Sequence, residues 1–477
     1  MTIDLTLCPK NIGLSGRQSL SNKEIESMPL VPPDVLVRIA HCIGDAGTLF
    51  SFLEALGTPE ARGGSLESLW QLGLVHERMT LWPMLRLSNG LMESSMAHVE
   101  EVISMYSAIQ ICWADDIDWL ISHLRLPTKV EWNVFLPGSF CGPIPDCEWF
   151  DKWSHLPITS LKLQVPPNYT IGATLYPWLA NLINTMTQLE LSGYLNVAAI
   201  FSFAAVSTRV TKLEMRCYSH VILTNAVVRD VMQWLESTPV RRFRFHTWLI
   251  AQEVEASEYE ALCAAMFHSP TLDELSLVRC TCLPLVTSLN PLQPLAMQEL
   301  TLCDLYLSPQ SIASLACVVR HSSLVTLTLA SILHIVDNLN DAYEDAFAQL
   351  LQAVAQSNIV YLALDYCALG DNMWQQHGVL LGHTNIQNLS LKNNSISNVG
   401  GACIALALGE NAAIQKVNLE GNNISGQGVR WLLNSNPCCN IPLRELVLIE
   451  NGKFEDNEKA ELKALAKTNG VLTLRLQ

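Results

Sequence analysis

One nine-residue stretch near the C-terminal end of the sequence decides the fold, because it occurs three times. IQNLSLKNN at residues 386–394 returns as IQKVNLEGN at 414–422 and as LRELVLIEN at 443–451. The shared pattern is LxxLxLxxN, in which apolar and polar residues alternate before a closing asparagine. Such alternation is typical of a short β-strand with one buried face.

The second apolar position of this pattern can be followed toward the N-terminus at intervals of 24 to 35 residues. The twelve anchor residues are Leu161, Leu189, Leu213, Phe243, Leu275, Leu300, Leu327, Leu362, Leu389, Val417, Leu446 and Leu474. Intervening segments such as 342–355 and 397–408 carry apolar residues at helical spacing. We therefore expect each repeat to add one strand to a parallel sheet, and the stacking of repeats to complete the core.

The repeats resemble leucine-rich repeats of the ribonuclease-inhibitor-like class over residues 157–477. The resemblance implies an α/β solenoid, a horseshoe with the parallel sheet on its concave face and helices on its convex face. The asparagine at the strand end can satisfy backbone groups where the chain turns away, and Cys280 and Cys367 fit the same position as weaker substitutes. Asparagines at this position in successive repeats would form a ladder of hydrogen bonds. Where Trp248 or Leu305 stands instead, we expect the ladder to be broken.

Composition excludes several classes of protein. With 477 residues, 49% of them apolar and 16% charged, the chain is predicted to fold, and it is longer than one compact core allows. A net charge of −16 disfavours nucleic acid and membrane surfaces as partners. The fifteen cysteines are odd in number and scattered, and no secretory signal or membrane span is evident, so we expect reduced thiols in the cytoplasm or nucleus.

Motifs that would indicate catalysis are missing from the sequence. It contains no Gly-x4-Gly-Lys-Ser/Thr phosphate loop, no His-Glu-x-x-His, no paired Cys-x2-Cys and no Gly-x-Ser-x-Gly. We therefore expect no enzyme activity, no cofactor and no metal site.

The N-terminal region has a different character. Residues 1–28 are polar without periodicity and predict a flexible tail, whereas residues 29–87 predict a helical segment. VPPDVLVRI at 31–39 begins a helix with proline in its first turn, and Leu36, Ile39 and Ile43 fall on one face. A second short amphipathic helix follows the break at Gly44.

Residues 31–56 resemble the F-box, a helical motif that couples a substrate-binding domain to the adaptor subunit of cullin-based ubiquitin ligases. Pro32, Leu36, Ile39, Ile43, Asp45 and Leu49 stand at matching places. The resemblance implies that the adaptor contacts Pro32, Pro33, Leu36, Ile39, Ile43, Leu49 and Leu53.

The resemblance ends after Leu56, where the valine-cysteine-arginine ending of the family is absent. The later Leu-Trp pair of the family corresponds either to Leu69-Trp70 or to Leu81-Trp82. The alternative is that residues 31–87 are only a helical cap that seals the first repeat. Residues 88–156 are an irregular transition or degenerate first repeats, with VEW at 130–132 as a further strand.

These features leave two candidate functions from different classes. The first is a protein-protein interaction module that serves as substrate receptor of a cullin-based ubiquitin ligase, with the adaptor, the cullin complex and an unknown protein substrate as partners. The second is a scaffold, an inhibitor or a regulator of a small GTPase.

Two neighbouring repeats concentrate cations on the face of the sheet that points away from the core. Alternation places Lys212, Glu214 and Arg216 outward on one strand, and Arg242, Arg244 and His246 outward on the next. We predict that Lys212, Arg216, Arg242, Arg244 and His246 bind an acidic or phosphorylated segment of the partner. The alternative is that they are ordinary solvated residues, partly neutralised by Glu214 and Glu190.

Overall fold

The computed structural model describes residues 31–124, 126–136, 147–165, 171–281, 283–333, 341–435 and 443–476. The tail predicted for residues 1–28 lies outside these ranges. The described residues form two compact units: unit 1 runs to Arg86 and includes Gly90–Tyr106, and unit 2 includes Leu87–Asn89 and continues from Ser107. Each unit is described separately below.

In the part of the chain that the structure describes, fifteen strands form one sheet in strict sequence order from β1 to β15. Every neighbouring pair from β2 to β15 is parallel. The strands are β1 (Leu85–Ser88), β2 (Ala108–Cys112), β3 (Lys129–Trp132), β4 (Ile158–Val165), β5 (Gln188–Gly193), β6 (Lys212–Leu223), β7 (Arg242–Ile250), β8 (Glu274–Val278), β9 (Glu299–Cys303), β10 (Thr326–Ala330), β11 (Tyr361–Asp365), β12 (Asn388–Ser390), β13 (Lys416–Asn418), β14 (Glu445–Val447) and β15 (Thr473–Arg475).

Helices separate most of these strands along the chain. They are α1 (Pro33–His41), α2 (Ala46–Ala55), α3 (Pro59–Arg62), α4 (Gly64–Val75), α5 (Arg78–Leu81), α6 (Asn89–Val102), α7 (Ile117–His123), α8 (Cys147–Ser154), α9 (Ile171–Leu179), α10 (Val197–Val206), α11 (Asn225–Ser237), α12 (Ala256–Phe267), α13 (Leu285–Ser288), α14 (Pro309–Val319), α15 (Asp341–Ala355), α16 (Asp371–His377), α17 (Asn398–Glu410), α18 (Gly426–Asn434) and α19 (Asp456–Thr468). Short 3-10 helices are η2 (Ile103–Met105), η3 (Ala180–Leu182) and η4 (Gly378–His383).

The register of the sheet is the one that the sequence predicts. All twelve anchors, from Leu161 on β4 to Leu474 on β15, are register partners of one another in turn. The row continues toward the N-terminus through Trp132 on β3 and Ile111 on β2. VEW at 130–132 is therefore a further strand, as predicted, and strand and helix already alternate within residues 88–156.

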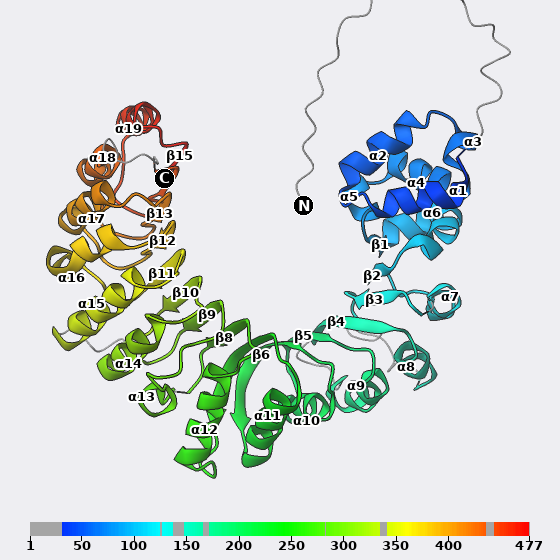
Figure 1. Cartoon of the computed structure of the whole chain (residues 1–477), viewed down its shortest axis with the longest axis horizontal. Helices are drawn as coiled ribbons and strands as arrows, with labels where there is room; N and C mark the ends of the chain where they lie inside the picture. The colour runs from blue at the N-terminus through cyan, green and yellow to red at the C-terminus, as the bar shows by residue number, and fades with distance from the viewer. Residues whose placement is uncertain are drawn as a thin grey trace, which may run out of the picture. The chain divides into compact units, whose positions relative to one another are not determined.

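Within unit 2 the strands line the inner side of a curved array and the helices cover its outer side (Figure 1). The apolar residues of the strands are buried between the two layers, as Leu300 and Leu302 on β9 illustrate. Unit 2 is therefore an α/β solenoid with a parallel sheet on the concave face, and the predicted fold class is confirmed.

The turn that follows each strand repeats in its backbone conformation. In the successive repeats that follow β7 to β12, and again after β14, the residue before the asparagine position has a positive φ between 50° and 73°: Thr247, Arg279, Asp304, Ser331, Tyr366, Asn393 and Glu450. Gly421 fills the same place after β13 with φ of 68°. Left-handed backbone is costly for residues other than glycine, so the repeat interfaces must hold these turns in place.

Unit 1 is held by a buried apolar core and by capped helices. Asp45 accepts a hydrogen bond from the Thr48 backbone N–H at 2.8 Å and caps α2, and this bond holds the pKa of Asp45 below its ordinary value. Leu49, Phe50 and Leu53 of α2 are buried. The ring centroids of Phe50 and Trp70 lie 6.4 Å apart.

Both tryptophans that could end the helical segment take part in this unit. The Trp70 ring lies under the Arg62 guanidinium, 4.9 Å from its carbon, and Arg62 also bonds to the Leu53 carbonyl at 3.1 Å. Trp82 is buried, and its indole N–H donates to the Ile43 carbonyl at 2.7 Å. Trp82 thus ties the chain after α5 to the loop between α1 and α2.

Candidate functional site

The five residues of the predicted concave patch lie together on two neighbouring strands. Lys212 of β6 is the register partner of Arg242 of β7, and Arg216 is the partner of His246. Arg244 pairs in register with Glu214. Neighbouring strands lie ~4.8 Å apart, so all of these side chains can meet.

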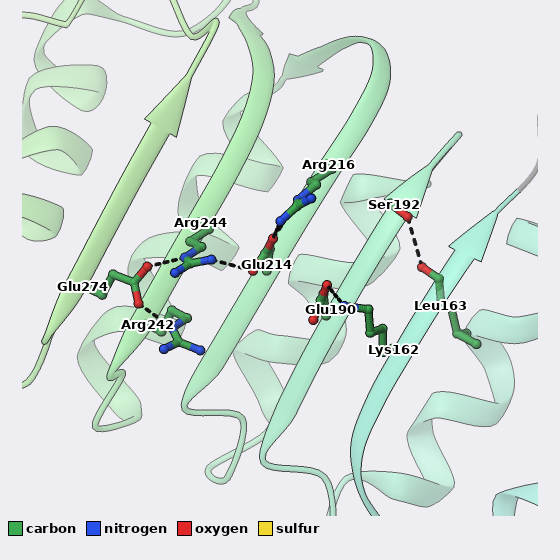
Figure 2. A network of polar contacts seen from close by, with 9 residues as sticks. All are labelled: Lys162, Leu163, Glu190, Ser192, Glu214, Arg216, Arg242, Arg244 and Glu274. Carbon is green, nitrogen blue, oxygen red and sulfur yellow. Dashed lines mark hydrogen bonds and ion pairs between the residues drawn. The ribbon is translucent and has the colours of Figure 1, made fainter. Parts of the chain in front are cut away.

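Two glutamates organise the arginines of this patch (Figure 2). Glu274 on β8 accepts hydrogen bonds from the Nε atoms of Arg242 and Arg244. Glu214 on β6 bonds to Arg216 Nε at 2.7 Å and to Arg244 Nη1 at 3.3 Å. Three guanidinium groups are therefore bridged by two carboxylates into a single network.

Both bridging carboxylates are buried, with Glu214 only 7% exposed and Glu274 only 8% exposed. A buried carboxylate is costly unless it is paired, so the network is needed to hold these groups in the sheet. Burial alone would lower the pKa of Arg244, but the hydrogen bond and the charge of Glu274 outweigh it and raise the pKa. The arginines remain cationic.

His246 is a weaker base than an ordinary histidine. Its burial, followed by the charge of Arg216, lowers its pKa below the ordinary value. The firm cations are Lys212, Arg216, Arg242 and Arg244, and the two glutamates neutralise half of that charge. Glu299, on β9, is the exposed register partner of Glu274.

The surface is therefore less cationic than the sequence suggests. Glu214 was expected to neutralise part of it, whereas Glu274 was not identified. Glu274 directly precedes the anchor Leu275, as Arg242 directly precedes the anchor Phe243 one repeat earlier. The predicted register could therefore have placed Glu274 beside Arg242. Glu190, the other expected neutralising residue, pairs instead with Lys162 at 2.6 Å (Figure 2).

Some N–H donors of the cationic side chains are without hydrogen-bond partners within the described ranges. Among the residues that the structure describes, Lys212 Nζ and the two terminal nitrogens of Arg242 have no hydrogen-bond partner, although the Arg242 guanidinium is ion-paired with Glu274. Arg242 is held through its Nε, which orients the rest of the guanidinium. A fixed arginine loses little conformational freedom when it binds an anion.

In unit 1 the seven residues expected to contact an adaptor fall into two groups. Leu36, Leu49 and Leu53 are buried and pack within the unit, so in this conformation they support the fold and present no surface. Pro32, Pro33 and Ile39 are exposed, and Ile43 is half-buried. The sequence alone could not separate these groups, because α1 carries apolar residues on more than one face.

Exposed apolar side chains nevertheless form a stripe along α1. Val35 and Ile39 stand four residues apart on α1 and share a face, and Ile39 is 41% exposed. Val31, just before the helix, is exposed as well. Val31 and Val35 were not identified as contact residues, although the helical spacing of Val35 from Ile39 could have indicated Val35. This stripe is the part of α1 that is available to another protein.

Two further features are absent from the described part of the chain. No helix in it is both long and apolar enough to cross a membrane. Over the same ranges, no group of three or more His, Cys, Asp or Glu side chains is placed to hold a metal ion.

Comparison with known proteins gives little. No protein-family model matches this chain, and no curated protein matches it significantly. Among solved structures, a chain of the crystal structure of the Rad7 and Elc1 complex in yeast is similar, with a TM-score of 0.40 and 14% identity. The similarity covers 76% of this chain and 89% of that chain.

Proposed function

We propose that this chain is a recognition subunit of a cullin-based ubiquitin ligase and not itself an enzyme, working in the cytoplasm or nucleus. In this proposal unit 1 binds the adaptor subunit, and the concave face of unit 2 binds the protein to be modified. The bound protein carries an acidic or phosphorylated segment.

The exposed apolar stripe of α1 is the observation that carries this proposal. Val35 and Ile39 lie on a short helix whose other side, at Leu36 and Ala40, is already buried. Apolar side chains left in water on a surface helix are typical of a protein interface. The segment that bears them is the one that resembles the F-box.

The test is capture of the purified adaptor subunit by the full chain, with Ile39→Asp as the first variant. A carboxylate at this exposed position would be desolvated in the interface, so we expect at least a tenfold loss of adaptor binding without loss of folding. Leu36→Asp is unsuitable, because Leu36 is buried and a charge there would unfold unit 1.

A matched control introduces the same change into unit 2. Leu406 of α17 is also exposed and apolar, so Leu406→Asp should bind the adaptor as the wild type does. A wild-type chain that captures no adaptor would rule out the ligase function. The scaffold, inhibitor or GTPase-regulator function would then remain, with the N-terminal helices acting as a cap.

A further inference from the structure

Strands β6 and β7 extend beyond their neighbours at their C-terminal ends. β8 ends at Val278, the register partner of His246, yet β7 continues to Ile250. After a bulge in β6 the pairing resumes, with Ile222 opposite Leu249. The two strands thus form a ribbon that projects past the ends of β5 and β8.

The ribbon exposes apolar side chains on one of its sides. Trp248 and Leu223 are fully buried on the side facing the core. Ile222 and Leu249, on the opposite side, are 61% and 42% exposed. These register partners form an apolar pair that, within the described residues, nothing covers.

Two exposed tyrosines lie near these groups in the sheet, and Tyr218 stands between Arg216 and Ile222 along β6. Tyr194 and Tyr218 are both exposed and meet edge to face, with ring centroids 6.0 Å apart. Tyr218 follows Arg216 by two residues on β6, so the two side chains lie on the same face. Gln164 donates to the Tyr218 hydroxyl at 3.1 Å, which fixes the ring.

The exposed side chains of β6 and β7 form a surface that changes character along the strands. It starts with the cations Lys212, Arg242 and Arg244. It ends with Ile222 and Leu249, which follow the register shift in β6 and the left-handed Thr247 in β7. Five residues separate Arg244 from Leu249, and the left-handed Thr247 lies between them, so their backbone positions are at most about 18 Å apart. An extended peptide rises ~3.3 Å per residue, so two of its side chains four to six residues apart can span a distance of this size.

We propose that this face binds an extended peptide segment of a partner protein through two anchors. An anionic side chain binds to Arg242, Arg244 and Lys212, and an aliphatic or aromatic side chain four to six residues away packs on Ile222 and Leu249. The inference deepens the proposed function and rests on its assignment of partner binding to unit 2, but it does not depend on adaptor binding.

The charge of the network favours a peptide over a polyanion. Nucleic acid binding needs a row of cations that are free to neutralise successive phosphates. Here Glu214 and Glu274 already neutralise much of the guanidinium charge. What remains suits one or two anionic groups, either carboxylate or phosphate, and the apolar pair supplies the second anchor.

The experiment is a selection of phage-displayed random 12-residue peptides on the immobilised full chain. We expect the enriched peptides to share an acidic residue and an aliphatic or aromatic residue at a spacing of four to six. Enriched peptides without this spacing, or no enrichment at all, would overturn the proposal.

Two double variants then test the two anchors by fluorescence anisotropy with an enriched peptide. Arg242→Glu with Arg244→Glu, and separately Ile222→Ser with Leu249→Ser, should each weaken binding by about tenfold or more. The matched controls make the same changes at exposed sites elsewhere. They are Arg209→Glu with Arg320→Glu and Val286→Ser with Leu406→Ser, and they should bind like the wild type.

Synthetic peptides distinguish the sources of the anion. Replacing the acidic residue by glutamine should abolish binding, and replacing it by phosphoserine shows whether phosphate is preferred. Equal binding of the glutamine peptide would contradict the anionic anchor. Adaptor capture is measured on the same protein: capture without peptide binding refutes this inference alone, and peptide binding without capture refutes only the ligase function.

Discussion

The thiol of Cys367 donates a hydrogen bond to the carbonyl oxygen of Leu329 in the preceding repeat, at 3.5 Å. One repeat later, the Asn394 side-chain amide donates to the Leu364 carbonyl at 2.7 Å. The asparagine also accepts from the Cys367 backbone N–H at 2.9 Å, which a thiol does only weakly. Cysteine therefore serves as the weaker substitute that the repeat pattern predicts.

The ladder is most complete at Asn422. Its side-chain oxygen accepts from the backbone N–H groups of Asn394 and Ile396, both at 3.0 Å. Its amide donates to the carbonyls of Leu391 and Leu419, both at 2.9 Å. One buried side chain thus satisfies backbone groups from two repeats.

Asn422→Ala should therefore lower the free energy of unfolding by about 2–4 kcal/mol, because it leaves several buried backbone groups without partners. The measurement is urea denaturation followed by circular dichroism. Asn423→Ala is the matched control, since Asn423 is the exposed neighbour and should change stability by less than about 0.5 kcal/mol. Equal losses in both variants would contradict the ladder.

The strand leucines give a second prediction. Leu391 and Leu419 are fully buried between neighbouring repeats. Leu391→Ala or Leu419→Ala should cost about 2–5 kcal/mol, because each removes apolar burial and leaves a cavity. A loss under about 0.5 kcal/mol in the same denaturation measurement would place those side chains at the surface and reject the register.

The fold was predictable because periodicity encodes register directly. An anchor such as Phe243 could be assigned from spacing alone, and it pairs with Leu213 and Leu275 as expected. The site was less predictable. The role of Glu274 depends on lateral contacts between repeats, and the burial of Leu36 depends on how α1 packs, which a helical apolar pattern does not fix.

Unit 1 offers a matched pair of glycines on α4. A Cβ added at Gly73 would lie 1.9 Å from Cε1 of the buried Phe50 ring, whereas one added at Gly64 would meet nothing within 4 Å. Gly73→Ala should thus destabilise unit 1 by about 1–3 kcal/mol through overpacking. Gly64→Ala should be neutral or slightly stabilising, by up to about 1 kcal/mol.

Thermal unfolding of the full chain would compare the two glycine variants. The signal of Trp82 is the difference in fluorescence between each variant and the same variant carrying Trp82→Phe. If Gly73→Ala is as stable as Gly64→Ala, then α2 and α4 do not pack as described. Adaptor capture by the Gly64→Ala variant should remain at the wild-type level.

The last prediction concerns the thiols, whose reactivity depends on burial and on the thiolate fraction. Burial raises the pKa of Cys263 and of Cys280 to about 12, and it also raises the pKa of Cys367. At pH 8 a thiol with a pKa of about 12 is ionised to only about one part in ten thousand, and the buried sulfur is shielded from reagents as well. Cys42 and Cys317 are exposed.

Iodoacetamide at pH 8 should therefore modify Cys42 and Cys317 of the native chain at least on the order of a hundredfold faster than Cys263, Cys280 and Cys367. Mass spectrometry of the digested protein measures the rates. Raising the pH to 9.5 should leave the three buried thiols protected, because their pKa values still lie well above that pH. In denaturant all five rates should converge. Fast native labelling of Cys367 would show that its side chain does not reach the Leu329 carbonyl, and that the repeat turns outward at this point.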